Sequence, residues 1–254
     1  MTARREGMKV LVIDVGGSHV KIMATGHTEE RRFESGPTMT PAQMADGVKA
    51  LAAGWAYDAV AIGYPGVVVR DQPATEPYNL APGWVAFDYR KAFGCPVRIL
   101  NDAAMQALGG YREGKMLFLG LGTGLGTTLI VDGVVVPMEL AHLPYRRRTF
   151  EDYVGERAYE REGRKKWRKR VFDVAERLKA AFIPDDVVIG GGNLRLLKKL
   201  PIGCRAGDNA NAFAGGFRLW ASGPGAKQAS RRAPVQRKAA KATKATKATK
   251  ASTR

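Results

Sequence analysis

Short runs of apolar residues alternate along residues 10–190 with stretches whose apolar residues recur every three or four positions. Apolar runs of about four to eight residues are typical of buried strands, and the wider spacing is typical of helices packed on a core. Strands are predicted at residues 10–13, 20–23, 59–62, 97–100, 116–121, 128–131 and 187–189. Because strands and helical patterns alternate, the chain is expected to have an α/β architecture.

Capping residues and glycines set the expected limits of the helices. Helices are predicted at residues 41–53, 103–108 and 149–181. The first follows Thr40, and the second follows Asn101 and Asp102; all three are residue types that cap helix N-termini. Gly155 and Gly163 are expected to interrupt the third, because glycine weakens a helix interior.

An apolar run at the start of the chain ends in an acid and two glycines: Asp14, Gly16 and Gly17, followed by Ser18. Glycines let a backbone approach an anion without a clash, and a serine hydroxyl adds a donor. The segment is therefore suited to binding phosphate and magnesium. A β-hairpin with a Gly-Gly turn is an equally good interpretation of the same residues.

A second glycine segment, residues 118–131, also lies between two apolar runs. Its glycines occur at every second position from 120 to 126, so it does not contain a dinucleotide-binding G-x-G-x-x-G fingerprint. Two such segments can hold a phosphate chain between them. Residues 109–116 resemble a P-loop but have Met116 where a magnesium-binding Ser or Thr is needed, so we reject that interpretation.

Two further polar centres follow strand-like segments. Asn101 and Asp102 end an apolar run just before a helix, where Asp102 is either a chemical group or a simple helix cap. Glu139 and His142 are followed by Glu151. A single acid and His three positions apart are weak evidence for zinc, because further ligands are missing, and recognition of hydroxyl groups is the better interpretation.

The composition, 45% hydrophobic and 26% charged, is that of a soluble globular protein. No apolar run approaches the roughly 20 residues of a membrane span, and the N-terminal residues lack the apolar stretch of a signal peptide, so we expect a cytoplasmic protein. Cys95 and Cys204 are isolated and form neither a metal motif nor a disulfide framework.

Positive charge is concentrated in two places. Residues 226–254 contain ten of the 41 Lys and Arg residues and no acid, and they end in a Lys-Ala-Thr repeat that begins at Lys241. We expect this tail to be disordered, and it could bind nucleic acid. Residues 161–170 carry a second basic cluster, which is either a solvated helix face or a track for a polyanion.

Taken in order, these motifs resemble the ROK family of sugar kinases. The segments that carry the resemblance are residues 14–18, 79–84, 101–102, 121–126, 139–142 and 189–193. The resemblance implies a two-lobed actin-like ATPase (ribonuclease H-like) fold. Residues 1–103 would form a small lobe, completed by a helix at 207–220; residues 104–206 would form a large lobe, and residues 221–254 the basic tail.

The same resemblance implies the roles of individual residues. Asp102 would be the catalytic base, and Asp14 would hold Mg²⁺, through water. The sugar would be bound by Asn79, Asn101, Glu139, His142 and Glu151, with Glu156 as an alternative to Glu151. Phosphate would be bound by Asp14, Gly16, Gly17, Ser18, Lys21, Gly122, Thr123 and Gly124, and a nucleotide would lie beside Gly190, Gly191 and Gly192.

The chain departs from typical family members in the segment after His142. The cysteine-rich zinc loop is replaced by residues 143–148, and Ala141 stands where the family motif has Gly. This zinc-free form resembles the subgroup of polyphosphate glucokinases. The resemblance implies transfer of a phosphoryl group from polyphosphate or ATP to the 6-hydroxyl of glucose, by a homodimer.

Two alternatives stay open at this stage. One is an ATP-dependent ROK kinase for another hexose such as mannose. The other is a kinase-derived scaffold that binds nucleic acid through its tail. The absence of an N-terminal helix-turn-helix before residue 8 argues against the repressor branch of the family, and the presence of Asp14 and Asp102 argues against an inactive scaffold.

Overall fold

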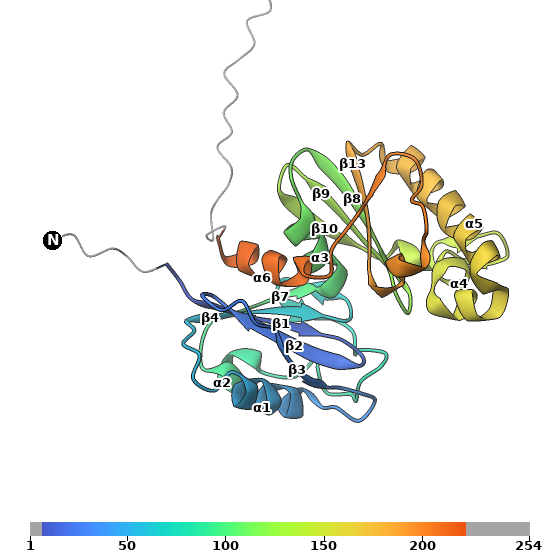
Figure 1. Cartoon of the computed structure of the whole chain (residues 1–254). Helices are drawn as coiled ribbons and strands as arrows, with labels where there is room; N and C mark the ends of the chain where they lie inside the picture. Colours follow the sequence, from blue (N-terminus) through green and yellow to red (C-terminus); the bar gives the residue numbers. More distant parts are fainter. Residues whose placement is uncertain (1–6, 222–254) are drawn as a thin grey trace, which may run out of the picture. The chain divides into compact units, whose positions relative to one another are not determined.

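The structure, a computed structural model, describes residues 7–221 (Figure 1). Two five-stranded sheets organise this part of the chain. The first sheet contains β1 (Val10–Val15), β2 (His19–Ala24), β3 (Arg31–Glu34), β4 (Ala59–Tyr64) and β7 (Val97–Asn101). The second contains β8 (Lys115–Leu121), β9 (Leu125–Val131), β10 (Val134–Met138), β13 (Asp186–Gly190) and β14 (Cys204–Ala206).

Helices and short strand pairs connect the strands of these sheets. The α-helices are α1 (Pro41–Leu51), α2 (Tyr89–Phe93), α3 (Asp102–Gly110), α4 (Glu151–Val154), α5 (Glu156–Phe182) and α6 (Asn211–Ala221). The short strands are β5 (Val68–Val69), β6 (Gln72–Pro73), β11 (Pro144–Tyr145) and β12 (Arg148–Thr149). Two 3₁₀ turns, η1 (Leu140–His142) and η2 (Gly192–Leu196), complete the elements of the described residues.

The two sheets repeat one topology. The strand orders are β3-β2-β1-β4-β7 and β10-β9-β8-β13-β14, and each sheet begins with an antiparallel meander and continues with parallel strands. The strand β8 therefore occupies in the second sheet the place that β1 occupies in the first. Each of these two strands leads into its partner through a glycine turn, so the two glycine segments have equivalent positions.

Side chains alternate between the two faces of each sheet, and each face is covered by different helices. Leu11 and Ile13 of β1 face the core that α1 covers, whereas Val10 and Val12 face α6. Figure 1 shows α3 and α6 between the two sheets, α1 beyond the first sheet and α5 beyond the second. Because Asp14 lies two and four positions from Val12 and Val10, its side chain is on the same face of β1, which is turned toward these central helices.

The central helices cross at two glycines. A Cβ atom on Gly109 would collide with the backbone of Asn211, and one on Gly215 would collide with the backbone of Met105. The absence of side chains at both positions lets α3 and α6 approach backbone to backbone, as small residues do at close helix crossings.

The predicted helix boundaries are largely confirmed. Thr40 caps α1 through a complete capping box with Gln43. Of the two possible caps of α3, it is Asn101 whose side chain accepts from Ala104 N, at 3.1 Å. Gly155 separates α4 from α5, and Gly163 has φ 74°, a conformation that interrupts α5.

All seven predicted strands are found, and other elements were missed. The strand β3 was missed because three of its four residues are charged, and β10 because Pro137 interrupts an apolar run. Both lie at sheet edges, where charged residues and proline are tolerated. The prediction for the tail falls on residues 222–254, outside the described residues.

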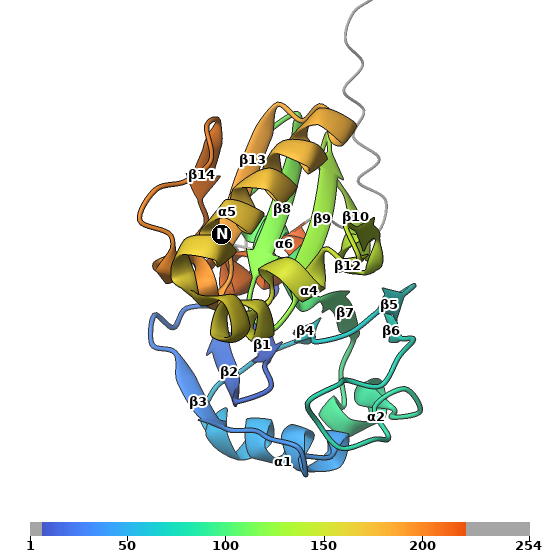
Figure 2. The ribbon, with the colours of Figure 1, turned by 90° about the vertical axis from the view of Figure 1, so that its right-hand side faces the viewer.

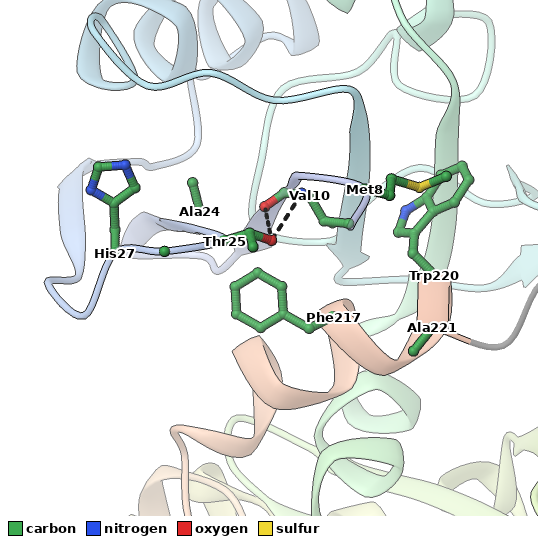
Figure 3. Close-up of a pocket in the computed structure, with 9 residues that line it drawn as sticks. Met8, Val10, Ala24, Thr25, His27, Phe217, Trp220 and Ala221 are labelled. Atoms are coloured by element: carbon green, nitrogen blue, oxygen red, sulfur yellow. Dashed lines mark hydrogen bonds between the residues drawn. The ribbon is translucent and has the colours of Figure 1, made fainter. Parts of the chain in front are cut away.

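No helix in residues 7–221 has both the length and the apolar character that crossing a membrane requires. A cavity of about 490 Å³ lies between α6 and the edge of the first sheet where β1 begins and β2 ends (Figure 3). Apolar side chains of α6, among them Phe217 and Trp220, face Val10 and His27 across it. None of the residues predicted to carry chemistry lines this cavity.

Candidate active site

The turn between β1 and β2 holds the first predicted phosphate motif. In the antiparallel pair Asp14 stands opposite Lys21, and Gly16 N donates to His19 O at 2.9 Å. Ser35 steadies the turn from β3's end: its hydroxyl donates to Gly16 O at 2.6 Å, and its amide donates to Ser18 O at 2.9 Å. The hairpin and the phosphate-loop interpretations are thus compatible, because the Gly-Gly segment is the turn of a hairpin.

Asp14 and Asp102 come from neighbouring regions of the first sheet. The parallel strands β1, β4 and β7 lie side by side, with Asp14 paired to Gly63 and Tyr64 paired to Asn101. A Cβ atom on Gly63 would be 3.5 Å from Asp14 Oδ1. The carboxyl ends of these strands therefore bring Asp14 toward the start of α3, where Asp102 follows Asn101.

The charge of Asp14 influences the ionisation of Asp102. Burial, followed by the negative charge of Asp14, raises the pKa of Asp102 to about 7, against an opposing hydrogen bond from Ala103 N at 2.7 Å. Burial also raises the pKa of Asp14, while the charge of Lys21 lowers it. A carboxyl group with a pKa near neutrality is suited to accept a proton during catalysis.

The side chain of Asn101 is held by the backbone on both sides. Its oxygen accepts from Ala104 N and its nitrogen donates to Gly66 O, both at 3.1 Å. This arrangement orients the end of β7 and the start of α3, and thereby Asp102.

The second glycine turn joins β8 to β9 through Gly122, Thr123 and Gly124. Its carbonyl groups accept from two other segments: Glu156 N donates to Gly122 O at 3.1 Å and to Thr123 O at 3.2 Å, and Asn193 Nδ2 donates to Gly122 O at 3.0 Å. The N-terminus of α5 and the η2 turn thus fix the shape of this loop. Within the turn, Gly122 N donates to Gly124 O at 3.2 Å.

The three nucleotide-side glycines lie next to this turn. Gly190 pairs with Gly120 at the end of β13, and Gly192 begins η2. Gly191 has φ 83°, and a Cβ atom there would collide with the backbone of Leu121. The close approach of the two backbones explains why glycine is required at this position.

Glu139, His142 and Glu151 form a second polar cluster. Glu139 Oε2 lies 3.9 Å from His142 Nε2, and both side chains are largely exposed. Partial burial raises the pKa of Glu139, His142 opposes this rise, and the charge of Glu151 adds to it. The charge of Glu139 in turn raises the pKa of Asp102. The structure therefore brings this cluster into the electrostatic neighbourhood of Asp102.

Glu151 lies directly against the second glycine turn. A Cβ atom on Gly124 would collide with the Glu151 carboxylate. Glu156, the alternative sugar ligand, contributes its backbone amide to the same turn, and its side chain is exposed. Because it is Glu151 whose charge acts on Glu139, the geometry favours Glu151 as a member of the cluster.

Asn79 approaches the first glycine turn from a long loop. A Cβ atom on Gly17 would lie 3.1 Å from Asn79 Cβ and 3.4 Å from its Nδ2. The loop is held by Glu76, whose carboxylate accepts from Gly83 N at 3.0 Å and from Trp84 N at 2.9 Å. The predicted sugar ligand Asn79 and the predicted phosphate ligand Gly17 are thus neighbours.

Sequence reasoning missed several residues that shape the site. Ser35 and Gly63 carried no motif, because their roles depend on strand pairing. Asn193 belonged to the recognised glycine segment, and its burial and bond to Gly122 are the signals that assign it a structural role. The rejected P-loop runs from the end of α3 into β8, whereas a P-loop runs from a strand into a helix.

Oxygen ligands for magnesium are available at the end of β1. A carboxylate such as Asp14 beside a glycine turn and an exposed backbone has the chemistry that Mg²⁺ prefers, since this ion takes one or two carboxylates and keeps several waters. Within residues 7–221 no group of three or more His, Cys, Asp and Glu side chains is placed to hold a metal ion by itself. A magnesium ion here would be completed by water and substrate phosphate.

Comparisons with known proteins place this geometry in context. Residues 10–137 match the model of the ROK family. The polyphosphate glucokinase of Mycobacterium tuberculosis (strain ATCC 25618 / H37Rv) is 28% identical over 220 residues, which cover 78% of this chain and 82% of that protein.

Two solved structures share the fold. The inorganic polyphosphate/ATP-glucomannokinase from Arthrobacter sp. strain KM matches with a TM-score of 0.73 at 23% identity, covering 85% of this chain and 99% of that one. A ROK family glucokinase from Streptomyces griseus, in complex with glucose and AMPPNP, matches with a TM-score of 0.64 at 18% identity, covering 83% and 98%.

Proposed function

We propose that this chain, which belongs to the ROK family, is a sugar kinase that transfers a phosphoryl group from polyphosphate or ATP to the 6-hydroxyl of glucose. Its two sheets form the two lobes of the actin-like ATPase fold. The similarity to polyphosphate glucokinase extends over 78% of the chain.

One observation carries the proposal: Asp102 lies at the carboxyl end of the first sheet with its pKa raised to about 7, chiefly by burial and then by Asp14. A helix cap alone gives no reason for this environment, and the cap of α3 is in any case Asn101. A carboxylate near the phosphate-binding turns, with a proton affinity suited to neutral pH, fits a general base.

In the proposed step the hydroxyl oxygen of the sugar attacks the terminal phosphorus of the donor. A new oxygen–phosphorus bond forms, the bond to the leaving phosphate oxygen breaks, and the hydroxyl proton passes to Asp102. Phosphoryl transfer depends mainly on positioning and on compensation of phosphate charge, so the surrounding residues matter through orientation. Asn101 contributes by holding the start of α3.

The sugar would be bound between the lobes by Asn79 on one side and by Glu139, His142 and Glu151 on the other. Their carboxylate, imidazole and amide groups offer both donors and acceptors to hydroxyl groups. Exposure of Asn79, Glu139 and His142 leaves these groups accessible to a ligand.

The phosphate groups would be bound by the two glycine turns, with Lys21 and Ser18 on the first and Thr123 on the second. Magnesium, which compensates phosphate charge in such reactions, would be held by Asp14 through water. We propose that no zinc takes part: metal analysis of protein purified without added zinc should show no stoichiometric zinc. One tightly bound zinc per chain would contradict this assignment.

Positive charge near the N-terminal half of α5 supports polyphosphate as a donor. Arg164, Lys165, Lys166 and Lys169 are exposed there, whereas Trp167 is buried with its Nε1 donating to Val154 O. The basic side chains thus lie on the solvent side of the helix, and the N-terminus of the same helix holds the second glycine turn. A long polyanion would be concentrated by such a surface.

A single experiment identifies both the sugar and the phosphoryl donor. Purified protein should be assayed with glucose and with mannose, each with ATP and with long-chain polyphosphate, in the presence of magnesium. Turnover of glucose with polyphosphate is the expected result. Turnover only of mannose with ATP would favour a hexokinase of other specificity; the name of the Arthrobacter glucomannokinase includes both mannose and ATP among its substrates.

No turnover in any of the four combinations would overturn the proposed kinase. The remaining function would then be a scaffold that binds nucleic acid through its basic tail, and binding of DNA or RNA by the full chain would be the next measurement.

A further inference from the structure

One contact joins the two lobes beside the candidate site. Arg157 Nη2 donates to the hydroxyl of Tyr78 at 3.2 Å, and its guanidinium lies 5.7 Å from the centroid of the tyrosine ring. Tyr78 belongs to the loop of the first lobe that carries Asn79, and Arg157 belongs to the first turn of α5 in the second lobe. Tyr78 is 80% exposed and Arg157 is exposed too, so packing against a core does not explain their pairing.

Both partners are mounted on segments that are themselves held in place. On one side Glu76 binds three successive amides of the Tyr78 loop, those of Gly83, Trp84 and Val85. On the other side the amide of Glu156, next to Arg157, binds the carbonyl groups of the second glycine turn. Because both segments are held by hydrogen bonds, the contact between Tyr78 and Arg157 restrains the distance between the Tyr78 loop and the start of α5.

The pair also bridges the two predicted phosphate turns. Asn79, next to Tyr78, packs against Gly17 of the first turn, and Glu156, next to Arg157, binds Gly122 of the second. The hydrogen bond with Tyr78, and then the charges of Glu151 and Glu160, raise the pKa of Arg157. Arg157 thus lies within the electrostatic reach of Glu151, a predicted sugar ligand. Figure 2 shows α4 and the start of α5 at the end of the second sheet that faces the first.

We infer that Tyr78 and Arg157 are positioning residues that form a clasp across the mouth of the acceptor site and hold the lobes in the closed arrangement. This inference rests on the proposed function for its kinetic consequence. A contact made only in the closed arrangement shifts the population toward that arrangement, and sugar ligands on the two lobes then act together.

The clasp predicts a selective kinetic change. Tyr78→Phe and Arg157→Gln should each raise KM for the sugar roughly two- to fivefold, the range for an exposed charged contact, with a smaller change in kcat. The change should be the same with ATP and with polyphosphate, because neither Tyr78 nor Arg157 is itself a predicted phosphate ligand. The double variant should be no worse than Arg157→Gln alone, since the two side chains act as one unit. Arg157→Lys should restore part of the lost affinity.

Arg177→Gln is a matched control. Arg177 also combines a hydrogen bond, to Asp173 at 3.2 Å, with an approach to a tyrosine ring, that of Tyr145 at 5.5 Å, but both partners belong to its own lobe. The same charge is removed from the same helix, and KM for the sugar should stay unchanged.

Hydrogen–deuterium exchange tests the clasp independently of activity. Without any ligand, peptides spanning residues 76–85 and 156–162 should exchange faster in Tyr78→Phe and Arg157→Gln than in the wild type or in Arg177→Gln. Faster exchange in a protein that phosphorylates no sugar would support the clasp and contradict the proposed function. Unchanged exchange, or fully additive effects on KM in an active enzyme, would overturn the clasp.

Discussion

At the scale of single residues, Asp102 shows how a residue at the start of a helix acquires a pKa that suits a proton acceptor. Its neighbour Asn101 caps α3, so the Asp102 carboxylate is not needed as the helix cap. Its burial and the nearby charge of Asp14 favour the protonated form, which is the opposite of what a helix N-terminus does to a carboxylate. Tertiary surroundings thus override the local effect.

Substitution of this carboxylate tests its proposed role. Asp102→Asn should lower kcat by about 10²- to 10⁴-fold, the range for loss of a general base, because an amide cannot accept the hydroxyl proton at neutral pH. The fold should persist, since Asn keeps an oxygen for the bond from Ala103 N. Steady-state assays with glucose, accompanied by thermal unfolding, provide the measurement. Asp88→Asn, at the cap of α2, is the control and should keep wild-type kcat. Activity of Asp102→Asn within a few-fold of wild type would exclude the role.

The raised pKa of Asp102 also predicts two pH dependences. Activity should fall below about pH 7, because the base must be ionised. Its contribution to stability is present below the ordinary pKa of 3.8 and is lost as the pH rises to about 7, since the folded state favours the protonated form. Asp102→Asn should therefore unfold at a higher denaturant concentration than the wild type at pH 8, and the difference should shrink toward pH 4. An equal difference at both pH values would contradict the raised pKa.

At the scale of elements, the glycine turns and the central helices depend on close backbone approach. The turns expose backbone to a ligand, while Gly109 and Gly215 let α3 and α6 cross between the sheets. The start of α3 carries Asp102, so the crossing also supports the position of the proposed base.

A methyl group at the crossing should be costly. Gly215→Ala places a Cβ atom against the backbone of Met105, where no flexible side chain can yield, so the helices must move apart. We expect a loss of roughly 1–3 kcal/mol in unfolding free energy, as for overpacked cores, despite the better helix propensity of Ala. Urea unfolding measures it. Gly192→Ala, with no atom within 4 Å of the added Cβ, is the control and should change stability little. Equal stability of both variants would show that the crossing accommodates a side chain.

At the scale of the whole molecule, charge is divided between the described part and the tail. Ten of the 41 Lys and Arg residues lie in residues 226–254, and the other 31 are accompanied by all 24 acids. An electrostatic role of the tail is separable from the chemistry, because every proposed site residue lies in residues 14–192.

Deletion of residues 226–254 should raise KM for long-chain polyphosphate at low salt and leave kcat and KM for ATP and glucose unchanged. Ten linked positive charges increase the local concentration of a long polyanion, and salt weakens this attraction steeply. Donor kinetics of the full and the truncated chain at two salt concentrations measure the effect. Equal use of polyphosphate by both chains at low salt would leave the tail without a part in donor capture.

Local chemistry in the sequence determined much of the architecture of the described residues. Apolar runs marked seven strands, Thr40 and the pair Asn101 and Asp102 marked helix starts, and Gly155 and Gly163 marked interruptions, because these signals act between residues a few positions apart. The ordered motifs also predicted the ROK family, which the match over residues 10–137 confirms. The roles of the individual site residues, and the lobe boundaries, stay predictions.

Only the tertiary structure decided how these segments meet. The repeated topology that makes the two glycine turns equivalent, the burial that raises the pKa of Asp102, the contact of Glu151 with Gly124 and the pairing of Tyr78 with Arg157 all join residues far apart in the chain. Periodicity shows that a segment has a buried face, but strand register and helix crossing determine which distant side chain that face meets. The electrostatic environment of a carboxylate depends on those neighbours, so it emerges only when the sheets and helices are packed together.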